Sequence, residues 1–143
     1  MARYSTTVES DLSVDDAFAY MADLRNFAEW DPGVSEAELI RADGPGPDAV
    51  YRVTANGIEL EYETREFQPP TQVFVVAEST FFESADRVTV EPHAGGSRVT
   101  YEAELRLPGP LRLFDPVLSI VFNRIGDKAA AGLEKAIGAE RVS

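Results

Sequence analysis

The C-terminal segment from Leu111 to Ala139 constrains the fold most strongly, because its hydrophobic period predicts one long amphipathic helix. Asp115 and Pro116 are typical of a helix start, with Asp115 as N-cap and Pro116 at the first helical position. Residues at helical spacing form one apolar face: Leu118, Val121, Phe122, Ile125, Ala129, Gly132 and Ala136. We expect this face to lie across a curved sheet.

Gly132 is the unusual residue of that face, because glycine inside a helix costs about 1 kcal/mol relative to alanine. The face is bulky in its first half and small in its second half, where Gly132 lies between Ala129 and Ala136. Two explanations stay open at this stage. The helix packs closely on the sheet there, or the small side chains leave space for a ligand.

The N-terminal part of the chain predicts a strand followed by two short helices. Residues 4–9 alternate in polarity, as in a half-buried strand. Ser13 is the expected cap of the first helix, and Asp23 that of the second. Pro32 and Gly33 should end the second helix before a strand over 34–40.

Asn56-Gly57 predicts a β-hairpin with a two-residue type I′ turn, and this turn fixes the register. The inner face then pairs Ala55 with Ile58, Val53 with Leu60 and Tyr51 with Tyr62. The outer face carries Glu59, Glu61 and Glu63, which could look like a metal or acid–base cluster. Their outward phase favours solvated side chains instead.

A second hairpin is predicted at Gly95-Gly96, which would pair Val90 with Tyr101 and Val88 with Ala103, with Arg87 opposite Glu104. With the other strands this gives an α+β fold of about seven antiparallel strands around the long C-terminal helix. Residues 1–143 contain no linker or repeat, so we expect one domain.

Charge and composition exclude several function classes. The formal net charge is −12, which disfavours nucleic acids and anionic membranes. The chain has no cysteine and one histidine, His93, which we place in an exposed turn, so no metal site, cofactor or histidine-based catalytic centre is expected. It has neither a signal segment nor an apolar run long enough for membrane insertion, and we expect a cytoplasmic protein.

The order of elements resembles the START-like helix-grip (SRPBCC) superfamily, and most closely its polyketide cyclase/dehydrase branch. The resemblance is carried by residues 13–23, by Trp30-Asp31-Pro32-Gly33-Val34 and by residues 111–116 before the final helix. It implies a cavity between sheet and helix that holds a hydrophobic molecule such as a lipid, sterol, quinone, isoprenoid or polyketide. It also implies that some members catalyse cyclisation or dehydration.

The candidate cavity wall combines inner-face tyrosines with the apolar face of the helix. The candidate ligand-binding residues are Tyr51, Tyr62, Tyr101, Leu118, Phe122, Ile125, Ala129 and Gly132. A tyrosine there offers an apolar ring and a hydroxyl that needs a partner. The alternative is a core tyrosine that donates to the backbone or to water. We expect Trp30 to be a core anchor.

Glu66 and Asp86 are the weak catalytic candidates, since each shares the strand phase of inward residues. A carboxylic acid facing an apolar cavity has a raised pKa and can act as a general acid or base. Both residues lie near predicted strand ends, which favours solvated carboxylates instead.

Three hypotheses for the function remain. The leading one is a binding protein for a hydrophobic small molecule, possible transport included. The second is a polyketide cyclase or dehydratase that uses tyrosine hydroxyls with Glu66 or Asp86. The third is a non-catalytic interaction module with a collapsed cavity, whose acidic surface meets a basic partner. The oligomeric state is left open.

Overall fold

The computed structural model describes residues 2–79, 82–107, 109 and 115–143, without the side chains of Asp115 and Leu118. The elements are β1 (Ala2–Ser10), α1 (Val14–Ala22), the 3₁₀ turn η1 (Leu24–Asn26), α2 (Phe27–Trp30), β2 (Val34–Arg41), β3 (Val50–Ala55), β4 (Ile58–Gln68), β5 (Gln72–Glu78), β6 (Glu83–His93), β7 (Gly96–Arg106), α3 (Asp115–Ala136) and β8 (Ala139–Arg141). The described strands form one antiparallel sheet in the order β2-β3-β4-β5-β6-β7-β1-β8. The predicted α+β class with a long C-terminal helix is confirmed.

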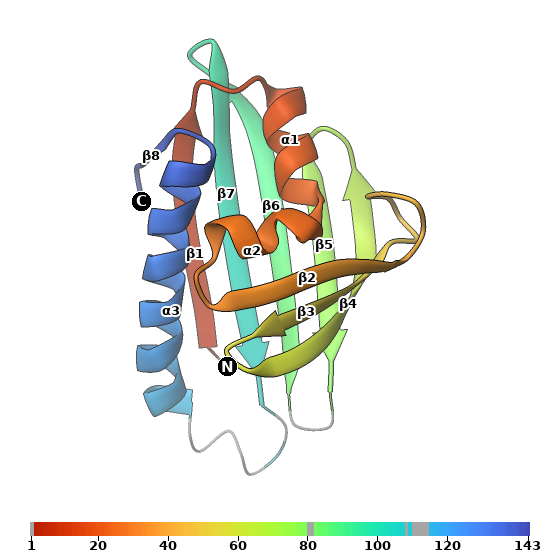
Figure 1. The fold of residues 1–143 in the computed structure, drawn as a ribbon. Helices are drawn as coiled ribbons and strands as arrows, with labels where there is room; N and C mark the ends of the chain where they lie inside the picture. Colours follow the sequence, from red (N-terminus) through yellow and green to blue (C-terminus); the bar gives the residue numbers. More distant parts are fainter. Residues whose placement is uncertain (1, 80–81, 108, 110–114) are drawn as a thin grey trace.

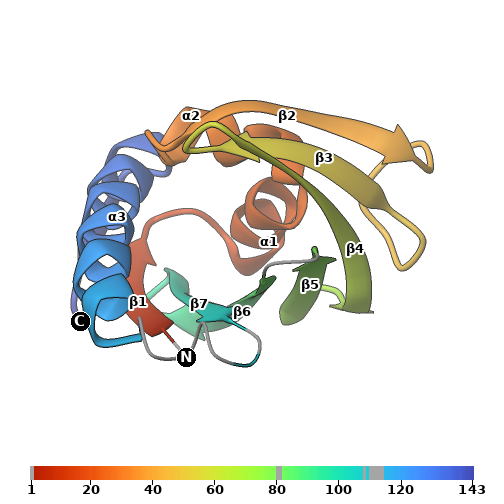
Figure 2. The ribbon, with the colours of Figure 1, turned by 90° about the horizontal axis from the view of Figure 1, so that it is seen from below.

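The sheet is strongly curved, and the helices lie on its concave side (Figures 1 and 2). Seen from below in Figure 2, α3 stands beside β1 at the open side of the curl, and α1 lies inside it. Helix α3 contacts β1 and α2. The core therefore lies on the concave face of the sheet, under all the helices. No helix in the described part of the chain is long and apolar enough to cross a membrane.

The two short helical segments begin at the residues that the sequence predicts. The Ser13 hydroxyl accepts a hydrogen bond from the Asp16 backbone N–H at 3.1 Å, and the Asp23 carboxylate accepts one from the Arg25 backbone N–H at 3.1 Å. Trp30 ends the second segment with 5% of its surface exposed. Its ring stacks on Phe27 and meets the edge of Tyr101, so Trp30 is a core anchor, as expected.

The central hairpin has the predicted turn and register. Asn56 and Gly57 both have positive φ, 52° and 80°, as a type I′ turn requires. Tyr51 pairs with Tyr62 and Val53 with Leu60, and each predicted pair of this hairpin is present. The glutamates of the outer face are solvated, also as predicted, and pair with Arg52 and Arg65.

The register of the second hairpin differs from the prediction by two residues. The turn is made by Ala94 and Gly95, with φ of 47° and 85°, so Val90 pairs with Val99, Val88 with Tyr101 and Arg87 with Glu102. Gly96 begins β7 instead, and a Cβ built on it would overlap the backbone carbonyl of Ser10. This glycine is required by close strand packing and not by the turn. A shift of two leaves every residue on its predicted face.

Helix α3 ends earlier than predicted. It stops at Ala136, Gly138 follows with φ of 59°, and the short strand β8 then pairs with β1. The predicted part of the helix before Asp115 lies outside the described residues. Val121 and Ala136 are exposed, contrary to the predicted face, and the buried residues include Ala130 and Leu133. The buried stripe is displaced because α3 packs against α2 as well as against β1.

Candidate functional site

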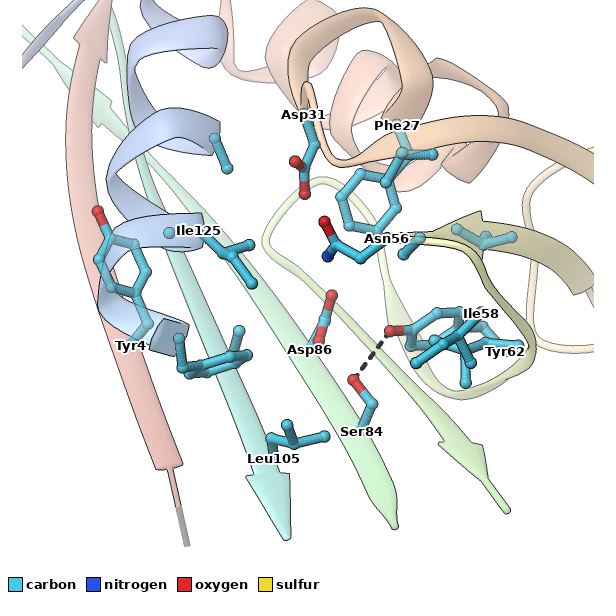
Figure 3. A pocket seen from close by; sticks show the side chains of 18 of the residues that line it. Tyr4, Phe27, Asp31, Asn56, Ile58, Tyr62, Ser84, Asp86, Leu105 and Ile125 are labelled. Atoms are coloured by element: carbon cyan, nitrogen blue, oxygen red, sulfur yellow. Dashed lines mark hydrogen bonds between the residues drawn. The ribbon is translucent and has the colours of Figure 1, made fainter. Parts of the chain in front are cut away.

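A cavity of about 340 Å³ lies between the concave face of the sheet, α2 and the middle of α3. Figure 3 shows side chains from these elements converging on it. Most of its wall is apolar, with Phe27, Val34, Val53, Leu60, Ala103, Leu105, Phe122, Ile125 and Ala129 among the lining residues. The tip of the central hairpin contributes the half-exposed Ile58.

Two hydrogen-bonded pairs form the polar part of the wall. The Tyr101 hydroxyl donates to Asp86 Oδ2 at 2.9 Å, and the Tyr62 hydroxyl lies 2.9 Å from Ser84 Oγ. Ser84 and Asp86 share one face of β6 because they are two residues apart. Tyr62 reaches Ser84 across β5, where the intervening paired residue is the small Ala77. The two pairs thus join β4 to β6 and β6 to β7 on the concave face of the sheet.

A second carboxyl group enters the cavity from above the sheet. Asp31 follows α2 and accepts a hydrogen bond from the Gly33 backbone N–H at 2.9 Å. Asn56, in the turn of the central hairpin, lines the same space. Figure 3 shows the carboxyl groups of Asp31 and Asp86 directed toward this space from opposite sides, with the Asn56 side chain between them. The cavity therefore contains two carboxyl groups contributed by separate elements.

Burial dominates the electrostatics of these groups. It raises the pKa of Asp86 to about 7, against the lowering effect of the Tyr101 hydrogen bond, and the charge of Asp31 adds to the rise. Burial also raises the pKa of Asp31, and the Gly33 hydrogen bond opposes this. The pKa values of Tyr62 and Tyr101 are raised by burial and by the charge of Asp86. Near neutral pH the phenols are donors, and Asp86 can hold or release a proton.

The comparisons with known proteins agree with this architecture. The family model described as polyketide cyclase / dehydrase and lipid transport matches residues 1–138. The chain belongs to this family. The search of curated proteins found no match.

Solved structures share the fold at low sequence identity. A START superfamily protein from Mycobacterium smegmatis is 20% identical with a TM-score of 0.69, over 96% of this chain and 98% of that one. A conserved protein from Geobacillus kaustophilus is 16% identical with a TM-score of 0.70, over 99% of both chains. The predicted START-like fold is confirmed. Fold and family fit a domain that binds a hydrophobic ligand.

The structure brings five of the predicted ligand-binding residues together around the cavity. Tyr62, Tyr101, Phe122, Ile125 and Ala129 line the cavity, and their contact with a ligand stays a prediction. Tyr51 is not among the lining residues. Its ring is 1% exposed, and its hydroxyl donates to the Ala22 carbonyl at 3.5 Å, as expected of a core tyrosine.

Gly132 also lies away from the cavity. A Cβ built on it would overlap the backbone carbonyl oxygen of Trp30. Of the two explanations for this glycine, close packing therefore holds, although the partner is the end of α2 and not the sheet. The side chain of the remaining candidate, Leu118, lies outside the described part of the structure.

Of the two acidic candidates, Glu66 is exposed and Asp86 is buried. Glu66 is exposed on the outer face, where Arg87 donates to it at 2.8 Å and Gln72 at 2.9 Å. The inward phase inferred for Glu66 is wrong because a bulge between Thr64 and Glu66 reverses the alternation of β4. Asp86 is 5% exposed, so the solvated interpretation is wrong for this residue.

The His93 side chain contacts Glu9 and Arg98 on the outer face. Its Nε2 lies 2.7 Å from Glu9 Oε2, and its Nδ1 lies 3.1 Å from an Arg98 nitrogen. The residue is therefore a partly exposed, paired side chain at the end of β6, next to the turn where the sequence placed it. No group of three or more potential metal-binding side chains occurs among the described residues.

Sequence reasoning missed three polar residues of the cavity. Asn56 and Asp31 were assigned only to a turn and a helix end. Ser84 had a usable signal, because it shares the strand phase of Asp86.

Proposed function

We propose that the protein binds a small hydrophobic molecule in the cavity lined by Phe122, Ile125 and Ala129. The observation that supports this is the cavity itself, about 340 Å³ with a mostly apolar wall and a few convergent polar groups. Small-molecule sites have volumes of about 300–1,000 Å³ and this division of polar and apolar surface. An apolar cavity of about 150 Å³ is already large enough for benzene.

The polar groups of the cavity wall can orient a bound ligand. The buried hydroxyls of Tyr62 and Tyr101 and the carboxyl of Asp86 lie on one side of the cavity, so a ligand with one polar end and an apolar body can satisfy both parts. Lipids, isoprenoids and polyketides have this form.

The test uses one cavity-filling variant and a matched control. Ala129 is 2% exposed and lines the cavity, and Ala131 is exposed on the same helix. Ala129→Leu should abolish the fluorescence gain of the neutral dye Nile red, while Ala131→Leu should leave it unchanged. Native mass spectrometry of freshly purified protein would identify a bound molecule in the unmodified chain.

Stability distinguishes a filled cavity from a damaged core. Filling an empty space adds apolar contact, so the melting temperature of Ala129→Leu should hold or rise. Overpacking costs typically about 1–3 kcal/mol and would lower it. Unchanged dye binding by Ala129→Leu at unchanged melting temperature would refute the proposal.

A second candidate function is an enzyme of the cyclase or dehydratase type, and the observation that favours it is Asp86. A buried carboxyl with a pKa of about 7 in a ligand cavity is suited to general acid–base catalysis near neutral pH. Once a substrate is known, Asp86→Asn should lower kcat about 10²-fold or more with little change in binding. Full activity of this variant would exclude that role.

A further inference from the structure

The cavity holds two carboxyl groups that have no basic partner in the described part of the chain. Asp31 is 8% exposed and Asp86 is 5% exposed, yet within the described ranges neither forms an ion pair. Asp31 accepts a hydrogen bond from a backbone N–H, and Asp86 accepts one from a phenol. Burying a charge costs several kcal/mol unless a partner compensates it. Among the described residues no cation is placed to compensate both charges, so a ligand could supply one.

The wall of the cavity repels anions. No lysine, arginine or histidine occurs among the described residues that line it. Beside Asp31 and Asp86, a ligand carboxylate or phosphate would find no counter-charge among these described lining residues, which is strongly unfavourable. A fatty acid therefore does not match this site.

The same wall suits a cation. The rings of Phe27, Tyr62 and Tyr101 line the cavity, and an aromatic face attracts an ammonium group when both are shielded from water. The net charge of −12 also favours the approach of cations over anions.

We propose that the ligand is a hydrophobic amine, whose ammonium group binds between Asp31 and Asp86 while its apolar body fills the space along Phe122 and Ile125. This inference rests on the proposed function. An ammonium carries three N–H donors and one positive charge. It supplies donors to the two carboxylates that point into the cavity in Figure 3, and the carbonyl of Asn56, which lies between them in that view, can accept another. A neutral hydroxyl supplies one donor and no charge.

Binding of an amine should be coupled to release of a proton from Asp86. Tyr101 donates to it from β7, Asp31 raises its pKa from the end of α2, and the charge of Asp86 in turn raises the pKa of Tyr62 on β4. Below pH 7 the carboxyl of the free protein is largely protonated, so binding of an ammonium displaces a proton. The affinity for the amine should therefore rise with pH up to about 7 and then level off.

The experiment compares three probes that share one apolar body: 2-(2-naphthyl)ethylamine, 2-(2-naphthyl)ethanol and 3-(2-naphthyl)propanoic acid. Isothermal titration calorimetry at pH 7.5 should show the amine binding at least 10-fold more tightly than the alcohol and no binding of the acid. Titrations near pH 6 in two buffers of different ionisation enthalpy should show proton release with the amine alone.

Variants locate the binding. Asp86→Asn and Asp31→Asn should each lower amine affinity at least 10-fold and leave alcohol affinity within about threefold. Glu66→Gln, which removes an exposed carboxylate of the outer face, should change neither. Ala129→Leu should abolish binding of the amine, which excludes attachment to the acidic surface.

The outcomes separate this inference from the proposed function. Equal binding of alcohol and amine, or an amine affinity that Asp86→Asn and Asp31→Asn leave unchanged, overturns the amine inference and keeps the hydrophobic site. Amine binding that survives Ala129→Leu also overturns it. If none of the three probes binds, the amine inference falls, and the proposed function falls with it only if Nile red also fails to bind.

Discussion

Asp86 should make the folded protein less stable as the pH rises from 4 to 7. Burial raises the pKa of this carboxyl from 3.8 to about 7. The unfolded chain therefore loses the proton near pH 4, and the folded chain retains it until about pH 7. Across this interval the folded state binds more protons, so the free energy of unfolding falls with rising pH. Above pH 7 both states are ionised and this contribution is constant.

The size of the loss follows from the shift. One pKa unit corresponds to about 1.4 kcal/mol, so a shift from 3.8 to about 7 gives roughly 4 kcal/mol as an upper value. Relaxation around the charge and water entry into the cavity reduce this, and we expect roughly 2–4 kcal/mol. In Asp86→Asn the amide oxygen can still accept the Tyr101 hydrogen bond, but the group no longer ionises.

The measurement is urea unfolding of both proteins between pH 4.5 and 8, followed by the fluorescence of Trp30, the single tryptophan. Every other titrating group is common to both chains, so the difference in unfolding free energy isolates Asp86 together with its influence on Asp31. Asp86→Asn should gain relative stability as the pH rises. The matched surface variant Glu66→Gln should differ from the unmodified protein by about 1 kcal/mol or less throughout. A difference for Asp86→Asn that stays constant within about 0.5 kcal/mol across this range would refute the reasoning.

Two further predictions concern glycines. Gly57→Val should destabilise by more than about 1 kcal/mol, because a β-branched residue resists φ of 80°; an unchanged urea midpoint would show that the turn tolerates it. Gly132→Ala should destabilise by about 1–3 kcal/mol although alanine favours the helix by about 1 kcal/mol, because its Cβ overlaps the Trp30 carbonyl; a stabilised variant in the same assay would contradict this packing.

The sheet was predictable where two independent signals agreed. At the central hairpin, Asn56-Gly57 fixed the turn and the alternation of Tyr51, Val53, Leu60 and Tyr62 fixed the same register. At the second hairpin the only guide was Gly95-Gly96, and Gly96 serves a contact with Ser10 that is distant in sequence. A local pattern cannot distinguish a turn glycine from a glycine required by such a contact.

The site was only partly predictable because its key geometry is not local. Alternation along β4 assigns Glu66 to the inner face, and only the pairing with β5 reveals the bulge that turns it outward. The burial of Asp86 likewise depends on the phenol of Tyr101 and on the helices above it. Asp31 enters the cavity because the segment after α2 is held over the sheet, and its sequence context indicates no more than a helix end.

Gly132 marks the part of α3 that is closed to a ligand. The glycine lets α3 approach the backbone of Trp30, so the C-terminal half of the helix is held against α2 with no space between them. Toward its N-terminus the helix presents Phe122 and Ile125, which line the cavity. The close packing at Gly132 and the cavity beside Phe122 and Ile125 therefore belong to different parts of the same helix. The sequence suggested space for a ligand at Gly132, but α3 packs on Trp30 there. The cavity instead lies beside Phe122, Ile125 and Ala129.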